Sequence, residues 1–396
     1  MNPLLRVLKP IASLRLTVAL FAMAMFLILA GTLAQVDEGI WSVVARYFRS
    51  LVVRIPFQIF VPRSMAHIPG AILFPGGFLI AAVMLVNLLA AHAVRFKFST
   101  RRIGIIVTHA GVILLIVGEF VTGLAATEGN MAIDEGQTAS YVEDIRSSEL
   151  AVIDPSGDDD DLVVVVPDRI LSRPGARIAH SLLPFEIRVD EWMPNSSILG
   201  PMQTSPEKAA NAAKADSGAG KTITAVPAPQ ATGVDGANAD VPSAYITLFR
   251  GGQRLGSYLV TVHLEDPQPV EVGGKIYGIA LRFTRTYKPY SVHLIDFRHD
   301  KFVGTETPRN FSSLVRLSDP AHNVDRQVLI SMNHPLRYAG ETFYQASFKQ
   351  GDGGTVLQVV RNPGWLLPYI SCALVGGGML LHFGMKLVPV LRRRTR

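Results

Sequence analysis

Four apolar runs, each long enough to cross a lipid bilayer as a helix, constrain this chain more than any other feature. They span residues 14–33, 72–94, 103–124 and 366–385. A helix needs about 20 apolar residues to cross a hydrocarbon core of roughly 30 Å. Only 18% of the 396 residues are charged and the mean hydropathy is +0.28, which is too apolar for an ordinary soluble protein. The sequence therefore predicts a membrane protein with four transmembrane α-helices.

The basic residues lie beside these runs and mark one side of the membrane. Residues 126–364 carry 22 Lys and Arg against 29 Asp and Glu, whereas the whole chain has a net charge of +6. Twelve basic residues share one side if all four runs cross: Arg6, Lys9, Arg15, Arg95, Lys97, Arg101, Arg102, Lys386, Arg392, Arg393, Arg394 and Arg396. Cytoplasmic segments carry such an excess. Both termini are therefore predicted to be cytoplasmic, and the placement of the charge argues against nucleic-acid binding.

The predicted segments follow from these runs. They are an N-terminal basic segment with the first span (1–36), an external loop (37–71), a hairpin of the second and third spans (72–125), a proximal β-rich part of the external domain (126–194), a flexible insertion (195–242), a distal β-rich part (243–364), and the fourth span with a basic tail (365–396). In the external loop, Arg46, Arg49 and Arg54 are spaced among apolar residues. This predicts an amphipathic helix on the outer membrane surface, in contact with lipid. A basic surface that holds an anion is the alternative.

The external domain is predicted to be built from β-strands. After residue 125 the helical period gives way to short β-type runs such as DLVVVV, PFEIRVDEW and KIYGIALRFTRTY, separated by Gly, Pro and Asp. Residues 195–242 are rich in Ala, Gly, Pro, Ser, Asn and Asp, so they offer little apolar surface to offset the cost of ordering. One or two antiparallel sandwiches or meanders with a flexible insertion are therefore expected.

Histidines in the apolar runs are the first candidates for a functional site. His109 lies seven residues after Arg102, which places it roughly 10 Å into the membrane at about 1.5 Å per residue. Asn87 lies at a similar depth on the neighbouring span and is predicted to orient His109. His382 lies near the cytoplasmic end of the fourth span, and His92, close to Arg95, is interpreted as an interfacial residue.

These histidines suit two kinds of chemistry. An imidazole in an apolar site without acidic companions suits an axial ligand of haem iron better than a zinc site, which needs three or four ligands close together. Proton relay is the alternative. Glu119 lies ten residues after His109, near the external end of the span, and we interpret it as pairing with Gln35 or a loop arginine rather than acting directly.

A series of motifs runs in order along most of the chain. They are GTLAQ (31–35), NLL (87–89), RRIGIIVTHAGVILLIVGEFVTG (101–123), GNMAIDEGQ (129–137), LPFEIRVDEW (183–192), MNHPLRYAGETFYQASF (332–348) and NPGWLLPYI (362–370). With the four-helix plan, they resemble the ResB family of cytochrome c biogenesis proteins, the CcsB-type subunit of the system II haem-attachment machinery. Residues 195–242 match nothing expected of that family.

The resemblance implies a role in moving haem b, transiently bound, across the membrane and presenting it to the CxxCH thiols of apocytochrome c. It implies a CcsA-type membrane partner, whose tryptophan-rich motif this chain lacks, and it makes His109 an axial ligand of haem iron. The second ligand would come from the partner, and His382 is a weaker alternative from depth alone. Asn333, Tyr344 and Gln345 form a candidate surface for the apoprotein, although fold-determining roles are favoured for them.

The resemblance also implies a location and leaves two other functions open. The chain would lie in the bacterial inner membrane with its large domain in the periplasm, or in a thylakoid membrane. It would be a subunit of a haem-attaching complex and not an enzyme alone. A structural scaffold that stabilises the CcsA-type partner without contacting haem is one alternative, and an ion or proton transporter that uses His109 and Glu119 is the other.

Overall fold

The computed structural model describes residues 8–61, 65–95, 99–157, 160–173, 175–201, 203, 215–229, 240–301, 308–349 and 353–394. Arg6, Lys97 and Arg396, which the sequence places beside the membrane, lie outside these residues. The chain forms two compact units. We call them the helical unit, within residues 8–127 and 361–394, and the β unit, within residues 128–360, and each is described by itself.

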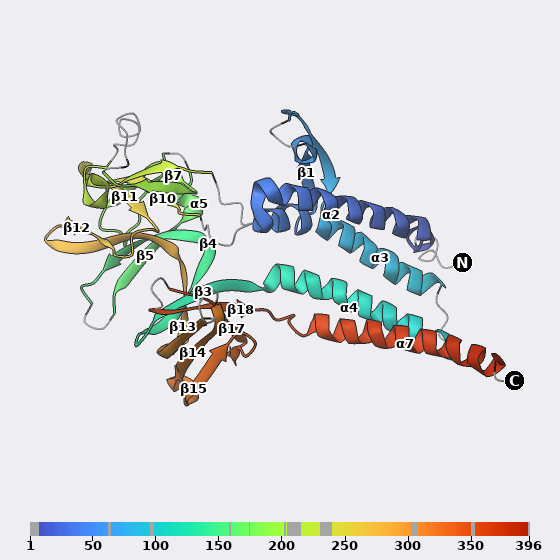
Figure 1. The fold of residues 1–396 in the computed structure, drawn as a ribbon. Helices are drawn as coiled ribbons and strands as arrows, with labels where there is room; N and C mark the ends of the chain where they lie inside the picture. The colour runs from blue at the N-terminus through green and yellow to red at the C-terminus, as the bar shows by residue number, and fades with distance from the viewer. Residues whose placement is uncertain are drawn as a thin grey trace. The chain divides into compact units, whose positions relative to one another are not determined.

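Four long helices make up most of the helical unit (Figure 1). They are α2 (Leu14–Val43), α3 (Gly77–Arg95), α4 (Ile103–Ala125) and α7 (Leu367–Arg394). Among the described residues, these four helices are long and apolar enough to cross a membrane. Together with the β unit they confirm the predicted fold class, a membrane protein with four transmembrane helices and a large β-rich domain.

The segment between α2 and α3 differs from the predicted amphipathic helix. The first helix changes direction at Gly39, whose φ of 72° suits a residue without a Cβ atom, and it continues through η1 (Val44–Phe48). The chain then forms a hairpin of β1 (Val52–Pro56) and β2 (Ala71–Pro75), with η2 (Phe57–Phe60) after the first strand. Val53 and Ile55 alternate inward and are buried, so this stretch follows the period of a strand. Because β2 takes residues 71–75, the second span starts at Gly77 instead of residue 72.

Glycines bring α4 and α7 into close contact. Gly104, Gly111 and Gly118 are buried and lie seven residues apart, on one face of α4. A Cβ atom on Gly104 would lie 2.6 Å from the backbone nitrogen of His382, and one on Gly111 would lie 2.9 Å from the Ser371 carbonyl oxygen. Small residues that let two backbones approach are typical of packing between membrane helices.

The β unit contains two large sheets. Its elements are β3 (Thr127–Asp134), β4 (Thr138–Asp154), β5 (Leu162–Pro167), α5 (Asp168–Leu171), β6 (Arg177–Ile178), β7 (Glu186–Met193), β8 (Ser196–Leu199), η4 (Gly218–Lys221), β9 (Thr224–Pro227), β10 (Ser243–Arg250), β11 (Gln253–Thr261), β12 (Gln268–Val272), β13 (Lys275–Lys301), β14 (Pro308–Asp319), η5 (Pro320–His322), β15 (Val324–Ser331), β16 (Leu336–Tyr338), β17 (Glu341–Phe348) and β18 (Gly354–Arg361). The larger sheet has the order β15-β14-β13-β4-β3-β18-β17-β16, with β12 beside β13 and β5 beside β4, and the smaller one has the order β11-β10-β7-β6. The pairings recorded in these two sheets are antiparallel, as the sequence predicts.

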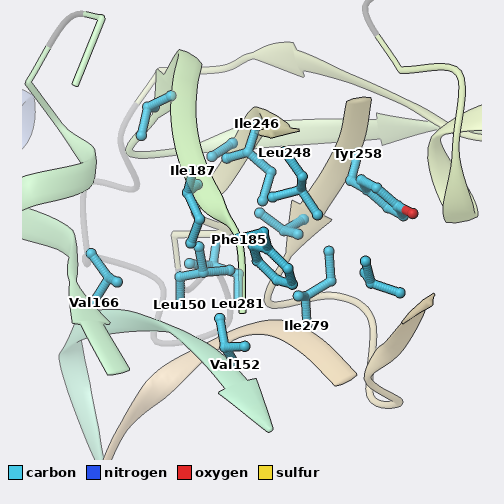
Figure 2. Packing of buried hydrophobic residues seen from close by; sticks show 14 of the residues in the cluster. Leu150, Val152, Val166, Phe185, Ile187, Ile246, Leu248, Tyr258, Ile279 and Leu281 are labelled. Carbon is cyan, nitrogen blue, oxygen red and sulfur yellow. The ribbon is translucent and has the colours of Figure 1, made fainter. Parts of the chain in front are cut away.

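Two hydrophobic cores share the long strands β4 and β13. In one core, Leu150 and Ile279 of these strands pack with Ile187 and Ile246 of the smaller sheet (Figure 2). The other core includes Leu294 of β13 and residues of β14, β17 and β18. The register between β4 and β13 shifts twice, which lets the same two strands serve both cores.

The predicted flexible insertion is partly an ordered β ladder. Within residues 195–242, β8 pairs with β9, and Ala225 packs with Tyr245 in a small core. The Tyr245 hydroxyl also contacts the backbone of Ala225, accepting from its nitrogen at 3.1 Å. The prediction overlooked two short β-type runs, SSIL and TITAVP, among the small residues. Residues 202, 204–214 and 230–239 of the insertion lie outside the described part of the chain.

A buried ionic pair joins β13 to β17. The Glu341 carboxylate accepts a hydrogen bond from Lys288 at 2.6 Å and another from the Tyr290 hydroxyl. Only 8% of the Glu341 side chain and 13% of the Lys288 side chain are exposed. Burial, reinforced by the bond to Glu341, raises the pKa of Tyr290, so this phenol stays protonated and donates. Nearby, the hydroxyl of Tyr338 donates to Asp319 at 2.6 Å and lowers the pKa of that carboxyl.

Glu341→Ala is expected to destabilise the protein by about 3–5 kcal/mol, because it leaves the Lys288 ammonium buried without its carboxylate. Urea unfolding of the full chain in detergent, followed by limited proteolysis, measures this loss. Asp325→Ala is the matched control: it breaks the exposed Arg316–Asp325 pair, in which both side chains are more than half exposed, and should cost less than about 1 kcal/mol. Equal losses in the two variants would contradict the expected role of the buried pair.

Candidate functional site

Two histidines from neighbouring helices meet in the helical unit. His92 of α3 and His109 of α4 lie with Nε2 of the first 3.1 Å from Nδ1 of the second. Their rings are nearly perpendicular, with an interplanar angle of 79° and centroids 4.9 Å apart. Nδ1 of His92 lies 2.8 Å from the backbone carbonyl oxygen of Leu88, one turn earlier in α3. Both rings are half-buried within the unit.

The pair lies in apolar surroundings. The helix that carries His109 has no acidic residue in its first turn, and its sequence from residue 103 to 118 contains no charged side chain. Within the part of the chain that the structure describes, no group of three or more His, Cys, Asp or Glu is placed to hold a metal ion. A neutral imidazole in such surroundings can bind a metal ion.

Asn87 does not orient His109, contrary to the prediction. Its amide nitrogen donates to the carbonyl oxygens of Ile11 at 2.5 Å and Ser13 at 3.2 Å, and its oxygen accepts from Thr17 at 2.7 Å. The chain interrupts its helix just before α2, and the Ser13 carbonyl oxygen there also accepts from the backbone nitrogen of Thr17 at 3.2 Å. Asn87, only 3% exposed, adds its hydrogen bonds to the carbonyl groups of this break and joins α3 to the start of α2.

Replacing Asn87 by leucine is therefore expected to loosen the contact between α2 and α3 and leave the histidine pair in place. Hydrogen bonds between membrane helices contribute about 0.6 kcal/mol on average and up to about 1.7, so we expect a loss of that order or somewhat more because three bonds are removed. Thermal unfolding in detergent measures it. A leucine variant that unfolds like the wild type would show that this polar contact does not stabilise the unit.

His382 packs against the beginning of α4. Its backbone packs against Gly104, and its ring contacts the neighbouring Phe383 at a centroid distance of 5.5 Å. Gly104 and His109 are five residues apart in α4, so they point about 140° from each other around the helix axis. Within the described structure, Nδ1 of His382 is buried without a hydrogen-bond partner. Its use as a second ligand within this chain remains a prediction.

Glu119 pairs with a loop arginine, as the sequence predicts. Its carboxylate lies 3.8 Å from the guanidinium of Arg49, which follows η1. The contact is long and the Glu119 side chain is 62% exposed within the unit, so the pair is weak in water and stronger in a membrane environment. Of the other loop arginines, Arg46 pairs with Glu38 at 2.7 Å.

The three candidate surface residues differ in their exposure and in their hydrogen bonds. Asn333 is exposed in a tight turn, which is closed by two backbone hydrogen bonds between Ser331 and His334. Tyr344 is 37% exposed on β17. Gln345 instead accepts from the hydroxyl of Ser313 at 2.6 Å and donates to Thr355 at 2.9 Å, so it joins three strands. The interpretation of Gln345 as a fold-determining residue and the predicted turn at Asn333 both agree with this geometry.

The histidine partner of His109 was missed in the sequence. His92 lies close to Arg95, and its depth alone indicated an interfacial residue. The signal that identifies it is rotational: Asn87 and His92 are five residues apart in α3 and point about 140° from each other, so only one of them can face α4.

The fold and the histidine pair define a class of protein: a four-helix membrane protein with a β-rich domain and paired imidazoles between two of its helices. Residues 276–360 match the model of the ResB-like family. The chain is 34% identical over 92 residues to protein NrfI of Wolinella succinogenes, a match that covers 23% of this chain and 10% of NrfI. It is 32% identical over 98 residues to the cytochrome c biogenesis protein CcsB of a Picosynechococcus species, covering 25% of this chain and 21% of that protein.

These matches support the ResB/CcsB-type assignment that the sequence predicts. The matches span only about a tenth and a fifth of the lengths of these two relatives. The family model covers β13 to β18, and His109 lies outside it.

Proposed function

We propose that this chain is a membrane subunit of a cytochrome c biogenesis complex of the system II type, and that it binds haem through His109. The observation that carries the proposal is the His92–His109 pair, an imidazole held by a second imidazole between two apolar helices. A half-buried ring fixed in this way suits axial coordination of haem iron. Haem b is here the cargo of the complex.

In this proposal each part of the chain has one task. Haem enters from the cytoplasmic half of the membrane between this chain and a CcsA-type partner, which supplies the second axial ligand. The complex moves haem to the outer face and presents it to the CxxCH thiols of apocytochrome c. The β unit lies in the periplasm, or in the equivalent thylakoid compartment, and positions the apoprotein, while both termini are cytoplasmic as the flanking basic residues predict.

The haem content of the purified complex tests this function. The chain is co-expressed with its CcsA-type partner, purified in mild detergent and compared with the His109→Ala variant. We expect the wild type to carry a low-spin haem spectrum and the variant to lose it at equal protein yield. Haem retained in full by His109→Ala would favour the scaffold alternative, in which this chain stabilises the partner and does not contact haem.

A further inference from the structure

With both rings neutral, the hydrogen bonds around His92 assign one proton to each ring. Nδ1 of His92 lies 2.8 Å from the carbonyl oxygen of Leu88, and a carbonyl oxygen only accepts, so this nitrogen carries a hydrogen. A neutral imidazole has one N–H group, which makes Nε2 of His92 an acceptor. Nε2 lies 3.1 Å from Nδ1 of His109, and that nitrogen is therefore the donor. The lone pair of His109 is then on Nε2, the ring nitrogen turned away from its own backbone.

We propose that His92 is a positioning residue, which fixes the tautomer and the ring direction of His109 so that Nε2 of His109 coordinates haem iron. This inference rests on the proposed function, because it assumes that His109 is the ligand. Metal-ligating histidines commonly donate their other N–H group to a neighbouring acceptor, which orients the ring and raises its basicity. Here the acceptor is a second imidazole, itself fixed by the carbonyl group of Leu88.

His92 acts through His109 and is not a second ligand. Both ring nitrogens of His92 are already used in hydrogen bonds, Nδ1 with the Leu88 carbonyl oxygen at 2.8 Å and Nε2 with Nδ1 of His109. The separation of 3.1 Å is that of a hydrogen bond. The acceptor also makes His109 a stronger electron donor, and this favours ferric over ferrous iron in the bound haem.

Two substitutions of His92 separate this role from packing. His92→Leu keeps much of the volume but removes the acceptor, whereas the side-chain oxygen of His92→Gln can still accept from Nδ1 of His109. Both are measured in the complex co-purified with the CcsA-type partner, beside His109→Ala. We expect the leucine variant to retain about 10–100-fold less haem, with a more positive midpoint potential of what remains, and the glutamine variant to stay near the wild type. A tenfold shift in the preference for ferric iron corresponds to about 59 mV.

A second measurement keeps the test independent of folding. In a His109→Gly background, added imidazole can coordinate iron and donate to His92, whereas 1-methylimidazole coordinates iron but has no N–H group to donate. His92→Leu should therefore raise the midpoint potential in the presence of imidazole and leave it unchanged with 1-methylimidazole. An equal effect with both ligands would overturn the positioning role.

The outcomes distinguish this inference from the proposed function. Full haem retention by His109→Ala would show that His109 is not a haem ligand. The proposed function would then be wrong as well. Loss of haem from His109→Ala together with an unchanged haem content and potential in His92→Leu would leave the proposed function standing and overturn the role of His92.

Discussion

His109→Ala is expected to reduce cytochrome c maturation to the background level of cells that lack this protein, while the variant still inserts and assembles. The substitution removes the imidazole that we propose as an axial ligand, and the helix tolerates alanine well. Haem staining of c-type cytochromes measures maturation, and immunoblotting of membranes measures the amount of the variant. Added imidazole should partly restore maturation by refilling the vacant position on the iron.

His382→Ala is the control for this prediction. His382 lies on another helix, with its backbone against Gly104 and its ring against Phe383, so we expect its loss to reduce maturation much less than the loss of His109. Normal maturation in His109→Ala, or an equal loss in both variants, would contradict the special role of His109.

Gly111→Leu is expected to separate α4 from α7 and to prevent stable assembly of the helical unit. Its Cβ atom would lie 2.9 Å from both the Ser371 carbonyl oxygen and the Val375 backbone nitrogen, which cannot move without shifting the helix. Overpacking of a tight contact costs about 1–3 kcal/mol, and a leucine against backbone atoms belongs at or above the upper end of that range. Thermal unfolding in detergent and the amount of protein in the membrane are the measurements.

Gly377→Leu on α7 is the matched control. A Cβ atom at Gly377 has nothing within 4 Å in the structure, so its side chain begins in open space. We expect this variant to accumulate and unfold like the wild type. If both leucine variants behave alike, close contact between α4 and α7 is not what holds these helices together.

Hydropathy and charge predicted the four spans, because both signals extend over many residues, and repeated β-type runs predicted the β-rich domain. The predicted amphipathic helix is helical only as far as Phe48, because Val53 and Ile55 beyond it follow the period of a strand. Backbone pairing with β2, distant in the sequence, decides between the two. The ladder of β8 and β9 was overlooked for a similar reason, since its partners are separated by more than twenty residues of small and polar composition.

The candidate site was predicted only in part. Depth along a helix is readable from the flanking arginines, and it identified His109 and the pairing of Glu119 with a loop arginine. The rotational phase of two helices is not readable in this way, and it decides that His92, and not Asn87, faces His109. The amide of Asn87 instead donates to the Ile11 and Ser13 carbonyl groups at a helix break that the sequence did not indicate.

Replacing His109 by a different iron ligand is a sharper test of its proposed bond to haem iron than removing the side chain. The measurement is the visible and electron paramagnetic resonance spectrum of the purified complex carrying His109→Met. If His109 is an axial ligand, the low-spin spectrum should change to that of a thioether-ligated haem, with a more positive midpoint potential. A His109→Met complex with the haem content, spectrum and potential of the wild type would show that His109 is not a ligand of the iron.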